Sequence, residues 1–211
     1  MDLFIFILNI IGTIAFAASG AILAIDKKMD IFGVAALGTI TAVGGGFIRD
    51  VTLGNVPPET FKTPVYALVA VGVSIIMFIP GVRKAMMKNR SFYDLMMFGM
   101  DSVGLGVFTV VGITYCMNLG FDGFFLNLFV GIITGVGGGV FRDILACDMP
   151  FIFRKHIYAC ASAAGAIITF LLYNVTEQWI ATTTGVLSII IIRCFSAYFR
   201  WNLPSPKAKS E

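Results

Sequence analysis

Charged side chains are scarce in this chain: Asp, Glu, Lys and Arg together make up 13% of its 211 residues. Soluble domains average about a quarter charged residues, so this chain has too few to cover a surface that faces water. Hydrophobic residues make up 58% of the sequence, and its mean hydropathy is +0.91. These values predict an integral membrane protein. The net charge of only +3, without a dense basic run, argues against a nucleic-acid partner.

Clusters of metal ligands and catalytic residues are also missing from the sequence. Four cysteines form no CxxC pair, and His156 is the single histidine. This pattern supports neither a zinc site nor a disulfide framework, so we interpret the cysteines as small core residues and His156 as an interfacial residue. No Ser/His/Asp or Cys/His set indicates catalysis, and no Lys-Ser/Thr follows the glycine runs as in a phosphate-binding loop. We therefore expect no enzymatic activity and no cofactor.

Long apolar runs are what the sequence contains instead. A membrane helix needs about 20 mostly apolar residues to cross roughly 30 Å of hydrocarbon. Seven stretches fit approximately: 3–25, 31–52, 64–82, 92–117, 123–146, 156–174 and 178–200. The first run is too long for a signal peptide, whose apolar part has about 7–15 residues, and no basic segment precedes it. The sequence thus predicts an all-α membrane protein with seven transmembrane helices.

Basic residues alternate between the loops in a way that predicts orientation. External loops would contain Lys62 as their only basic residue. The predicted cytoplasmic segments contain Lys27, Lys28, Arg83, Lys84, Lys88, Arg90, Arg154, Lys155, Arg200, Lys207 and Lys209. By the positive-inside rule, this bias predicts a multi-pass protein of the cell membrane with its N-terminus outside and its C-terminus in the cytoplasm.

The motif GGGxxRD occurs twice, at 44–50 and at 137–143, which is 93 positions apart. Earlier segments, 12–20 and 104–112, match at an offset of 92. Each unit contains three spans, an odd number, so the second unit must insert upside down, as in the inverted repeats of many transport proteins. The predicted division is a first three-helix repeat (1–90), a second inverted repeat (91–175), a seventh helix (176–200) and a cytoplasmic tail (201–211).

The glycine runs are the first group of candidate functional residues. Each glycine costs about 1 kcal/mol in a helix interior relative to alanine, so three in succession predict an unwound or kinked span whose carbonyls line a polar path. The alternative is close helix packing, which small residues permit. The candidate pore and hinge residues are Thr41, Gly44, Gly45, Gly46, Thr134, Gly137, Gly138 and Gly139.

Charged residues inside the spans are the second group. They are Arg49, Asp50, Asp101, Arg142 and Asp143. Residues at i and i+1 do not face each other on a helix, so we expect Arg49 to find a partner other than Asp50, with Asp101 and Asp143 of the opposite repeat as candidates. A buried network shaping a polar path is one interpretation. The alternatives are arginines that reach the headgroups and an Asp101 that serves only as a structural partner.

The doubled GGGxxRD motif and the segment DSVGLGVF at 101–108 resemble the prokaryotic trimeric intracellular cation (TRIC) channel family, which also carries a glycine-transporter label. This resemblance covers about residues 3–200. It implies seven helices in two inverted repeats plus one, kinks at the glycines, a homotrimer with one pore per protomer, and K⁺ as the permeant ion. Asn9 departs from the family, which often has Asp there.

Three functions remain open from the sequence. The first is a monovalent cation channel, in which carbonyls and the hydroxyls of Thr41 and Thr134 replace hydration water. The second is a carrier for glycine or another small zwitterion, whose carboxylate suits arginine. The third is a membrane scaffold in which the repeat serves only packing. The expected partners are further copies of the chain, membrane lipid, and K⁺ or glycine.

Overall fold

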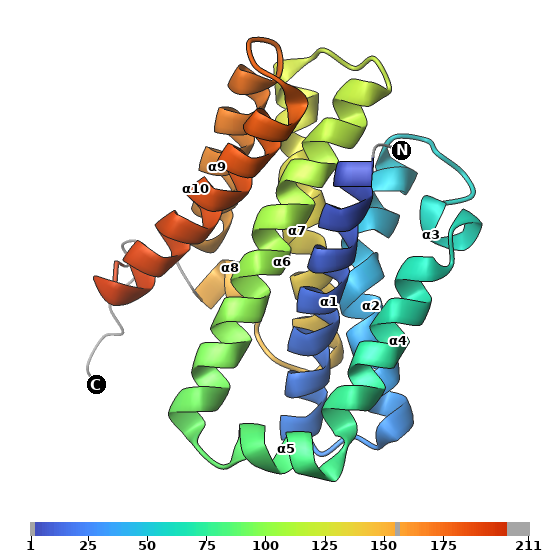
Figure 1. Cartoon of the computed structure of the whole chain (residues 1–211), viewed down its shortest axis with the longest axis vertical. Helices are drawn as coiled ribbons and strands as arrows, with labels where there is room; N and C mark the ends of the chain where they lie inside the picture. Colours follow the sequence, from blue (N-terminus) through green and yellow to red (C-terminus); the bar gives the residue numbers. More distant parts are fainter. Residues whose placement is uncertain (1–2, 155–156, 202–211) are drawn as a thin grey trace, which may run out of the picture.

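The computed structural model describes residues 3–154 and 157–201, and every regular element within them is a helix. The all-α fold is therefore confirmed for this part of the chain (Figure 1). The helices are α1 (Leu3–Asp26), α2 (Ile31–Thr52), α3 (Glu59–Lys62), α4 (Val65–Phe78), α5 (Pro80–Met87), α6 (Arg90–Asn118), α7 (Phe124–Leu145), α8 (Phe151–Arg154), α9 (Tyr158–Tyr173) and α10 (Gln178–Tyr198).

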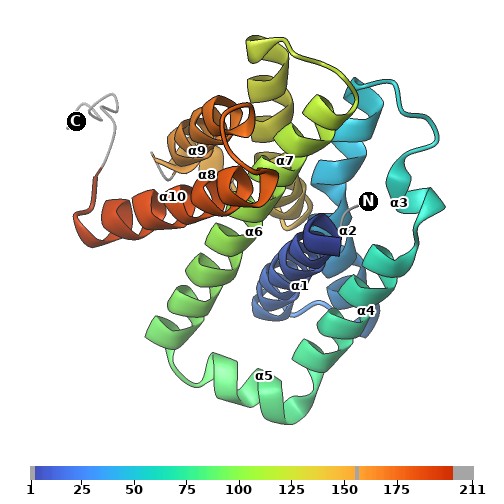
Figure 2. The same cartoon turned by 45° about the horizontal axis from the view of Figure 1, so that its top comes forward.

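Helices α1 and α6 form the centre of the bundle. α1 packs against α2, α4 and α6, while α6 also packs against α7, α9 and α10. Figure 2 shows α9 and α10 on one side of this centre and α3 with α4 on the other. Every residue of α1 from Ala15 to Ile25 is buried, and most of these side chains are small. Small side chains let helices approach closely, which is how membrane helices gain packing energy.

Within the described residues, five helices are long and apolar enough to cross a bilayer: α1, α2, α6, α7 and α10. The bent pair α4 and α5 would add a sixth span if the two helices cross together. Large apolar side chains cover the outside of the bundle, among them Phe32, Phe125 and Leu68, which are 78%, 80% and 68% exposed. Such a surface would be unstable in water but suits contact with lipid. The prediction of a multi-span membrane protein is therefore supported by both the helices and the surface around them.

The third predicted span, 64–82, is wrong at its end. α4 stops at Phe78, and the chain bends by 72° into α5. Pro80 explains this, because a proline has no N–H to continue a helix and forces the preceding Ile79 into an extended conformation, here with ψ at 131°. α5 consequently lies across one end of the bundle (Figure 2). At 1.5 Å per residue, the 14-residue α4 is about 21 Å long.

The sixth predicted span, 156–174, corresponds to α9, which has only 16 residues and follows the short α8. Thus the third helix of each predicted repeat is short and is preceded by a single helical turn. The expectations for Lys155, His156 and the tail from position 202 onward concern positions outside the described residues.

The glycine runs do not unwind. α2 continues as a helix from Ile31 to Thr52 and α7 from Phe124 to Leu145. A Cβ on Gly45 would lie 2.0 Å from the backbone oxygen of Thr134, and one on Gly138 would lie 2.2 Å from that of Thr41. The expected unwinding is therefore wrong, and the packing interpretation describes these contacts. The missing side chains let α2 and α7 cross at backbone contact, and this close packing compensates for the poor helix propensity of glycine.

Candidate functional site: two arginine clusters and two cavities

Contacts at the centre of the bundle are reciprocal between the two predicted repeats. Phe16 of α1 packs on Phe108 of α6, with ring centroids 5.3 Å apart. Gly104 makes room for the Phe16 ring, and Gly12 makes room for the Phe108 ring. These two glycines are 92 positions apart, as are the two phenylalanines. Like the Gly45 and Gly138 contacts, this exchange is what a pseudo-twofold relation between two copies produces.

The first charged group, here called the Arg142 cluster, consists of Arg142, Asp143, Asp101 and Arg193. Arg142 Nη1 donates to Asp101 Oδ1 at 2.8 Å and to Ser19 Oγ at 2.9 Å. Its Nε donates to Asp143 Oδ1 at 2.8 Å. Arg142 and Asp101 are fully buried, so water contributes little to screening these charges. Asp101 was expected as a candidate partner of Arg49, and this is wrong, because Asp101 pairs with Arg142; the interpretation of Asp101 as the structural partner of an arginine describes this contact.

Arg193 of α10 completes this cluster and was not among the candidate residues predicted from the sequence. Its Nη2 donates to Asp101 Oδ2 at 3.0 Å and its Nε to Ser102 Oγ at 3.0 Å. Its guanidinium also lies 4.5 Å from the centre of the Tyr158 ring. The signal was available, because Arg193 interrupts the apolar run 186–195, and a charge inside a membrane helix is a candidate functional residue.

The second charged group, the Arg49 cluster, consists of Arg49, Asp50 and Tyr115. Arg49 Nε lies 2.8 Å and its Nη2 2.7 Å from Asp50 Oδ1. The guanidinium carbon of Arg49 lies 3.9 Å from the Tyr115 ring centre, a close cation–π contact. The expectation that neighbouring arginine and aspartate do not pair is wrong in both clusters. That expectation considered only the directions in which the Cβ atoms of adjacent residues point. The arginine side chain is long enough to bend and reach the carboxylate of the next residue.

Both aspartates also hold the loop that follows their helix. Asp50 Oδ2 accepts from the backbone N–H of Glu59 at 2.8 Å, where α3 begins. Asp143 Oδ2 accepts from the N–H of Phe151 at 2.9 Å, where α8 begins. Each carboxylate therefore orients its arginine with one oxygen and fixes the loop with the other. A carboxylate at the first N–H of a helix is a favourable arrangement.

A cavity of about 520 Å³, here called the Asn9 cavity, opens beside the Arg49 cluster. Its polar lining comes from Asn9, Arg49, Glu59, Tyr66, Tyr115 and Asn118. A smaller cavity of about 40 Å³ shares Asn9 and Arg49 with it and extends inward to Thr13 and Gly46. Arg49 thus faces a space that can hold water, while its partner Asp50 is fully buried.

A second cavity, of about 490 Å³, lies at the opposite end of α1 and reaches Asp143; we call it the Asp26 cavity. The charged residues in its lining are Asp26, Asp94, Asp143, Asp148 and Arg90. The Asp26 and Asn9 cavities have matching walls. Asp26, Leu23 and Met97 stand 92 positions from Asn118, Tyr115 and Ile5, which line the Asn9 cavity.

Buried side chains separate the two cavities. Phe16 and Ser19 of α1 are fully buried between them, and so are Asp101 and Arg142. The hydroxyls of Thr41 and Thr134 are not aimed at an open path, since they donate to Leu37 O and Val130 O within their own helices, at 2.6 Å each. The conformation is therefore closed at its centre.

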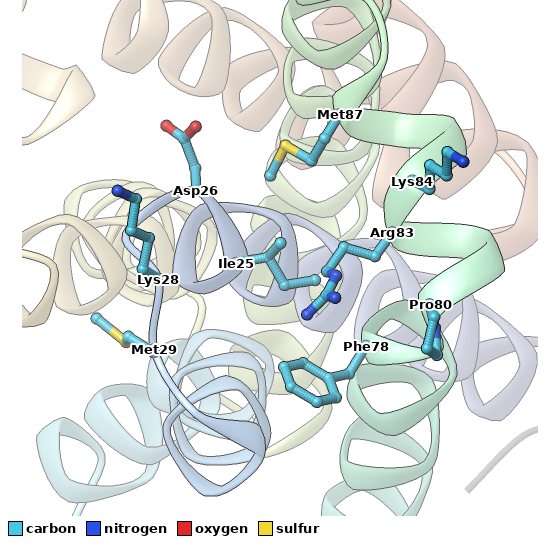
Figure 3. A pocket seen from close by; sticks show the side chains of 9 residues that line it. All are labelled: Ile25, Asp26, Lys28, Met29, Phe78, Pro80, Arg83, Lys84 and Met87. Atoms are coloured by element: carbon cyan, nitrogen blue, oxygen red, sulfur yellow. The ribbon is translucent and has the colours of Figure 1, made fainter.

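A third cavity, of about 650 Å³, lies where the end of α1 meets the bend between α4 and α5. Figure 3 shows Arg83, Lys84 and Lys28 around it together with apolar side chains such as Phe78. None of the predicted pore or network residues lines this cavity. It shares Asp26 with the Asp26 cavity but contacts neither arginine cluster, and so it lies outside the candidate site.

Comparison with known sequences identifies relatives along nearly the whole chain. The sequence model of a family described as glycine transporter matches residues 6–80 and 98–174, more than half of the chain. Inner membrane protein YadS of Escherichia coli K12 is 36% identical over 199 residues, covering 94% of this chain and 93% of that protein. Membrane protein YvgT of Bacillus subtilis is 31% identical, covering 94% and 95%.

Solved structures of TRIC channels have the same fold. A structure described as the TRIC orthologue from Rhodobacter sphaeroides matches with a TM-score of 0.86 at 30% identity, covering 95% of this chain and all of that one. A prokaryotic TRIC channel in 0.5 M KCl matches with a TM-score of 0.87 at 32% identity, covering 96% and 100%. These neighbours are channels and not enzymes.

Proposed function

This chain belongs to the prokaryotic TRIC family, which is also described as glycine transporter, and we propose that it is a monovalent cation channel that conducts K⁺ through one pore per protomer. It is a multi-pass protein of the cell membrane. The pore would run from the Asn9 cavity past the Arg49 cluster, between α1, α2, α6 and α7, to the Arg142 cluster and the Asp26 cavity.

The observation that carries this proposal is the pair of cavities at opposite ends of α1, of which one is acidic. Of the four aspartates that line the Asp26 cavity, Asp143 pairs with Arg142 and Asp148 with Lys27, whereas Asp26 and Asp94 share the single arginine of the lining, Arg90. A cavity lined mainly by one sign of charge concentrates counter-ions near its walls. Such a cavity would raise the local concentration of K⁺ and repel Cl⁻ before either ion meets the constriction.

The buried arginines do not oppose this proposal, because each is paired. Arg49 lies against Asp50, and Arg142 lies against Asp101 and Asp143. The positive charges are therefore largely compensated along the proposed route. One buried donor, Nη2 of Arg142, finds no acceptor among the described residues. A water molecule in the route would satisfy it, as buried donors generally require.

Glycine transport is the second candidate, and one observation favours it. Arg49 and Glu59 line the same Asn9 cavity. A guanidinium and a carboxylate that face one space match the carboxylate and the ammonium group of a small zwitterion. In this alternative the Asn9 cavity would be the loading site, and the closed centre would be the barrier of an alternating-access carrier.

We further propose the layout from which this function follows: two inverted three-helix repeats, 1–90 and 91–175, a seventh helix at 176–200, and a homotrimer embedded in lipid. The two stretches matched by the family model begin 92 positions apart, and the contacts between α1, α2, α6 and α7 are reciprocal. With the N-terminus outside, the Asn9 cavity would face the exterior and the acidic Asp26 cavity the cytoplasm.

Reconstitution into liposomes and planar bilayers tests the proposal. Unitary K⁺ currents that require no counterflow would support the channel. Saturable uptake of labelled glycine without unitary currents would reject the channel in favour of the carrier. Crosslinking in detergent would measure the oligomeric state, with a trimer as the expected result.

A further inference from the structure

We propose that Arg193 of α10 sets the charge and the closure of the constriction by neutralising Asp101, so that the seventh helix regulates conduction through the second repeat. This inference rests on the cation channel proposed above. It gives a role to the helix that stands outside the duplication. Arg193 acts through Asp101 and is a positioning residue.

The contacts of Arg193 are directed at the centre of the molecule although α10 lies on the side of the bundle (Figure 2). Its Nη2 donates to Asp101 Oδ2 while Arg142 Nη1 donates to Asp101 Oδ1. Asp101 is thus shared by two guanidinium groups, one from the second repeat and one from α10. Tyr158 OH also donates to Asp101, at 3.3 Å, and its ring faces the Arg193 guanidinium.

The charges of the Arg142 cluster cancel only when Arg193 is counted. Arg142 and Arg193 supply two positive charges, and Asp101 and Asp143 supply two negative charges. Without Arg193 the cluster would carry one net negative charge in a buried setting, where Coulomb interactions are weakly screened. A buried site with a net negative charge attracts a cation. The covalently attached guanidinium of Arg193 therefore occupies the position that a permeating cation would favour.

The Arg49 cluster lacks such an element. The position that corresponds to Asp101 by the 92-residue offset is Asn9, which is uncharged and lines a cavity. Arg49 and Asp50 balance each other without a third residue from another helix. Regulation by a side chain of the seventh helix is therefore specific to the Arg142 cluster, which fits its complete burial.

Single-channel recording of the full chain tests the inference. In the variant Arg193→Gln we expect the unitary K⁺ conductance to rise about two- to fivefold, from the Coulomb energy of one uncompensated charge near the path. The reversal potential in a KCl gradient should shift toward stronger preference for K⁺ over Cl⁻. Arg193→Lys, which keeps the charge, should behave as the parent protein, and the double variant Asp101→Asn with Arg193→Gln should return close to the parent conductance.

The matched control is Arg200→Gln, which removes an exposed arginine just beyond the end of α10 that lines none of the cavities described above and should leave conductance and reversal potential unchanged. The inference would be overturned if Arg193→Gln conducts no more than the parent protein and Arg193→Lys behaves as Arg193→Gln does. Altered conductance without any change in reversal potential would also overturn it, because a purely structural role predicts no change of selectivity.

A second measurement does not depend on conduction and separates this inference from the channel itself. Ser19→Cys would be placed in a protein whose four native cysteines are replaced by alanine, and its labelling by a cationic thiol reagent would be timed. Ser19 is fully buried against Arg142. We expect labelling at least about threefold faster with Arg193→Gln than with Arg193→Lys. Equal rates would reject the inference even if the parent conducts K⁺, and a parent that conducts no cation would reject the proposed function instead.

Discussion

The Arg49 and Arg142 clusters have the same sequence motif but different environments. Both arginines pair with the following aspartate, and both aspartates anchor a short helix through their second oxygen. Arg142 is fully buried and bonded to two further residues, Asp101 and Ser19. Arg49 makes no such contact with α1 or α6 carboxylates and instead stacks on Tyr115 beside a cavity. The motif therefore produces the arginine–aspartate pair. The neighbouring helices determine whether that pair is buried or lies beside a cavity.

In the channel proposed above, this difference would give the two clusters separate tasks. The Arg49 cluster, next to a wide cavity and with an uncharged Asn9, is suited to admit ions or small solutes. The Arg142 cluster, with Asp101 held by two arginines, is suited to act as the barrier. A channel made of two related halves can divide admission and closure in this way while keeping one scaffold.

The largest expected effect concerns Asp101. Asp101→Asn would leave Arg142 and Arg193 buried with a single carboxylate, and breaking a buried pair typically costs about 3–5 kcal/mol. We expect a large fall in thermal stability in detergent. The matched change Asn9→Asp, made beside the Asn9 cavity, should lower stability by less than about 1 kcal/mol. Similar losses at both positions would show that the two clusters are equally buried.

The next effect concerns the glycine crossing, which is predicted to be the same in both halves. Gly45→Ala and Gly138→Ala each push a methyl group against a backbone oxygen, so we expect each to destabilise the protein by about 1–3 kcal/mol. Gly46→Ala is the control, because a Cβ there would meet nothing closer than 4.0 Å. Melting curves measured by tryptophan fluorescence compare the three variants. If only one of the two variants, Gly45→Ala or Gly138→Ala, lowered the melting temperature, the two contacts between α2 and α7 would not be equivalent.

A smaller difference is expected when each arginine is replaced by lysine. Arg142→Lys loses the planar geometry that reaches Asp101, Ser19 and Asp143 together, at a cost of about 2 kcal/mol. Arg49→Lys keeps a charge beside Asp50 and a solvated cavity, at about 1 kcal/mol or less. Thermal stability is again the measurement. An Arg49→Lys loss that equals the Arg142→Lys loss would contradict the assignment of one open and one closed cluster.

The smallest effect concerns the corresponding cavity residues Asp26 and Asn118. Asp26→Asn should lower K⁺ conductance, and Asn118→Asp should raise it, each by less than about twofold at 0.1 M KCl. Both differences should disappear at 1 M KCl, where screening extends over only about 3 Å. Conductance measured at the two salt concentrations checks this. A salt-independent change would indicate a structural effect and not attraction of ions to the cavity.

Most residues of the two clusters could be selected from the sequence, but their geometry could not. The doubled motif and the charges inside apolar runs were enough to select Arg49, Asp50, Asp101, Arg142 and Asp143. The pairing between neighbours was mispredicted, because helix-face geometry says little about a side chain as long as arginine. Arg193 was overlooked, although its position in an apolar run marked it in the same way as Arg142.

The sequence itself determined three features: the membrane class, the all-helical fold, and the recurrence of the motif at 44–50 at positions 137–143. Hydropathy and repetition are properties of the chain alone. Tertiary structure alone decided that the glycines remain helical, because whether a triglycine segment unwinds depends on whether another helix packs against it. It also decided that Asp101 is shared by α7 and α10. Asp101 is far in sequence from the arginines of α7 and α10 that it contacts, so these side chains meet only when packing brings their helices together. No local sequence pattern encodes contacts over such a separation.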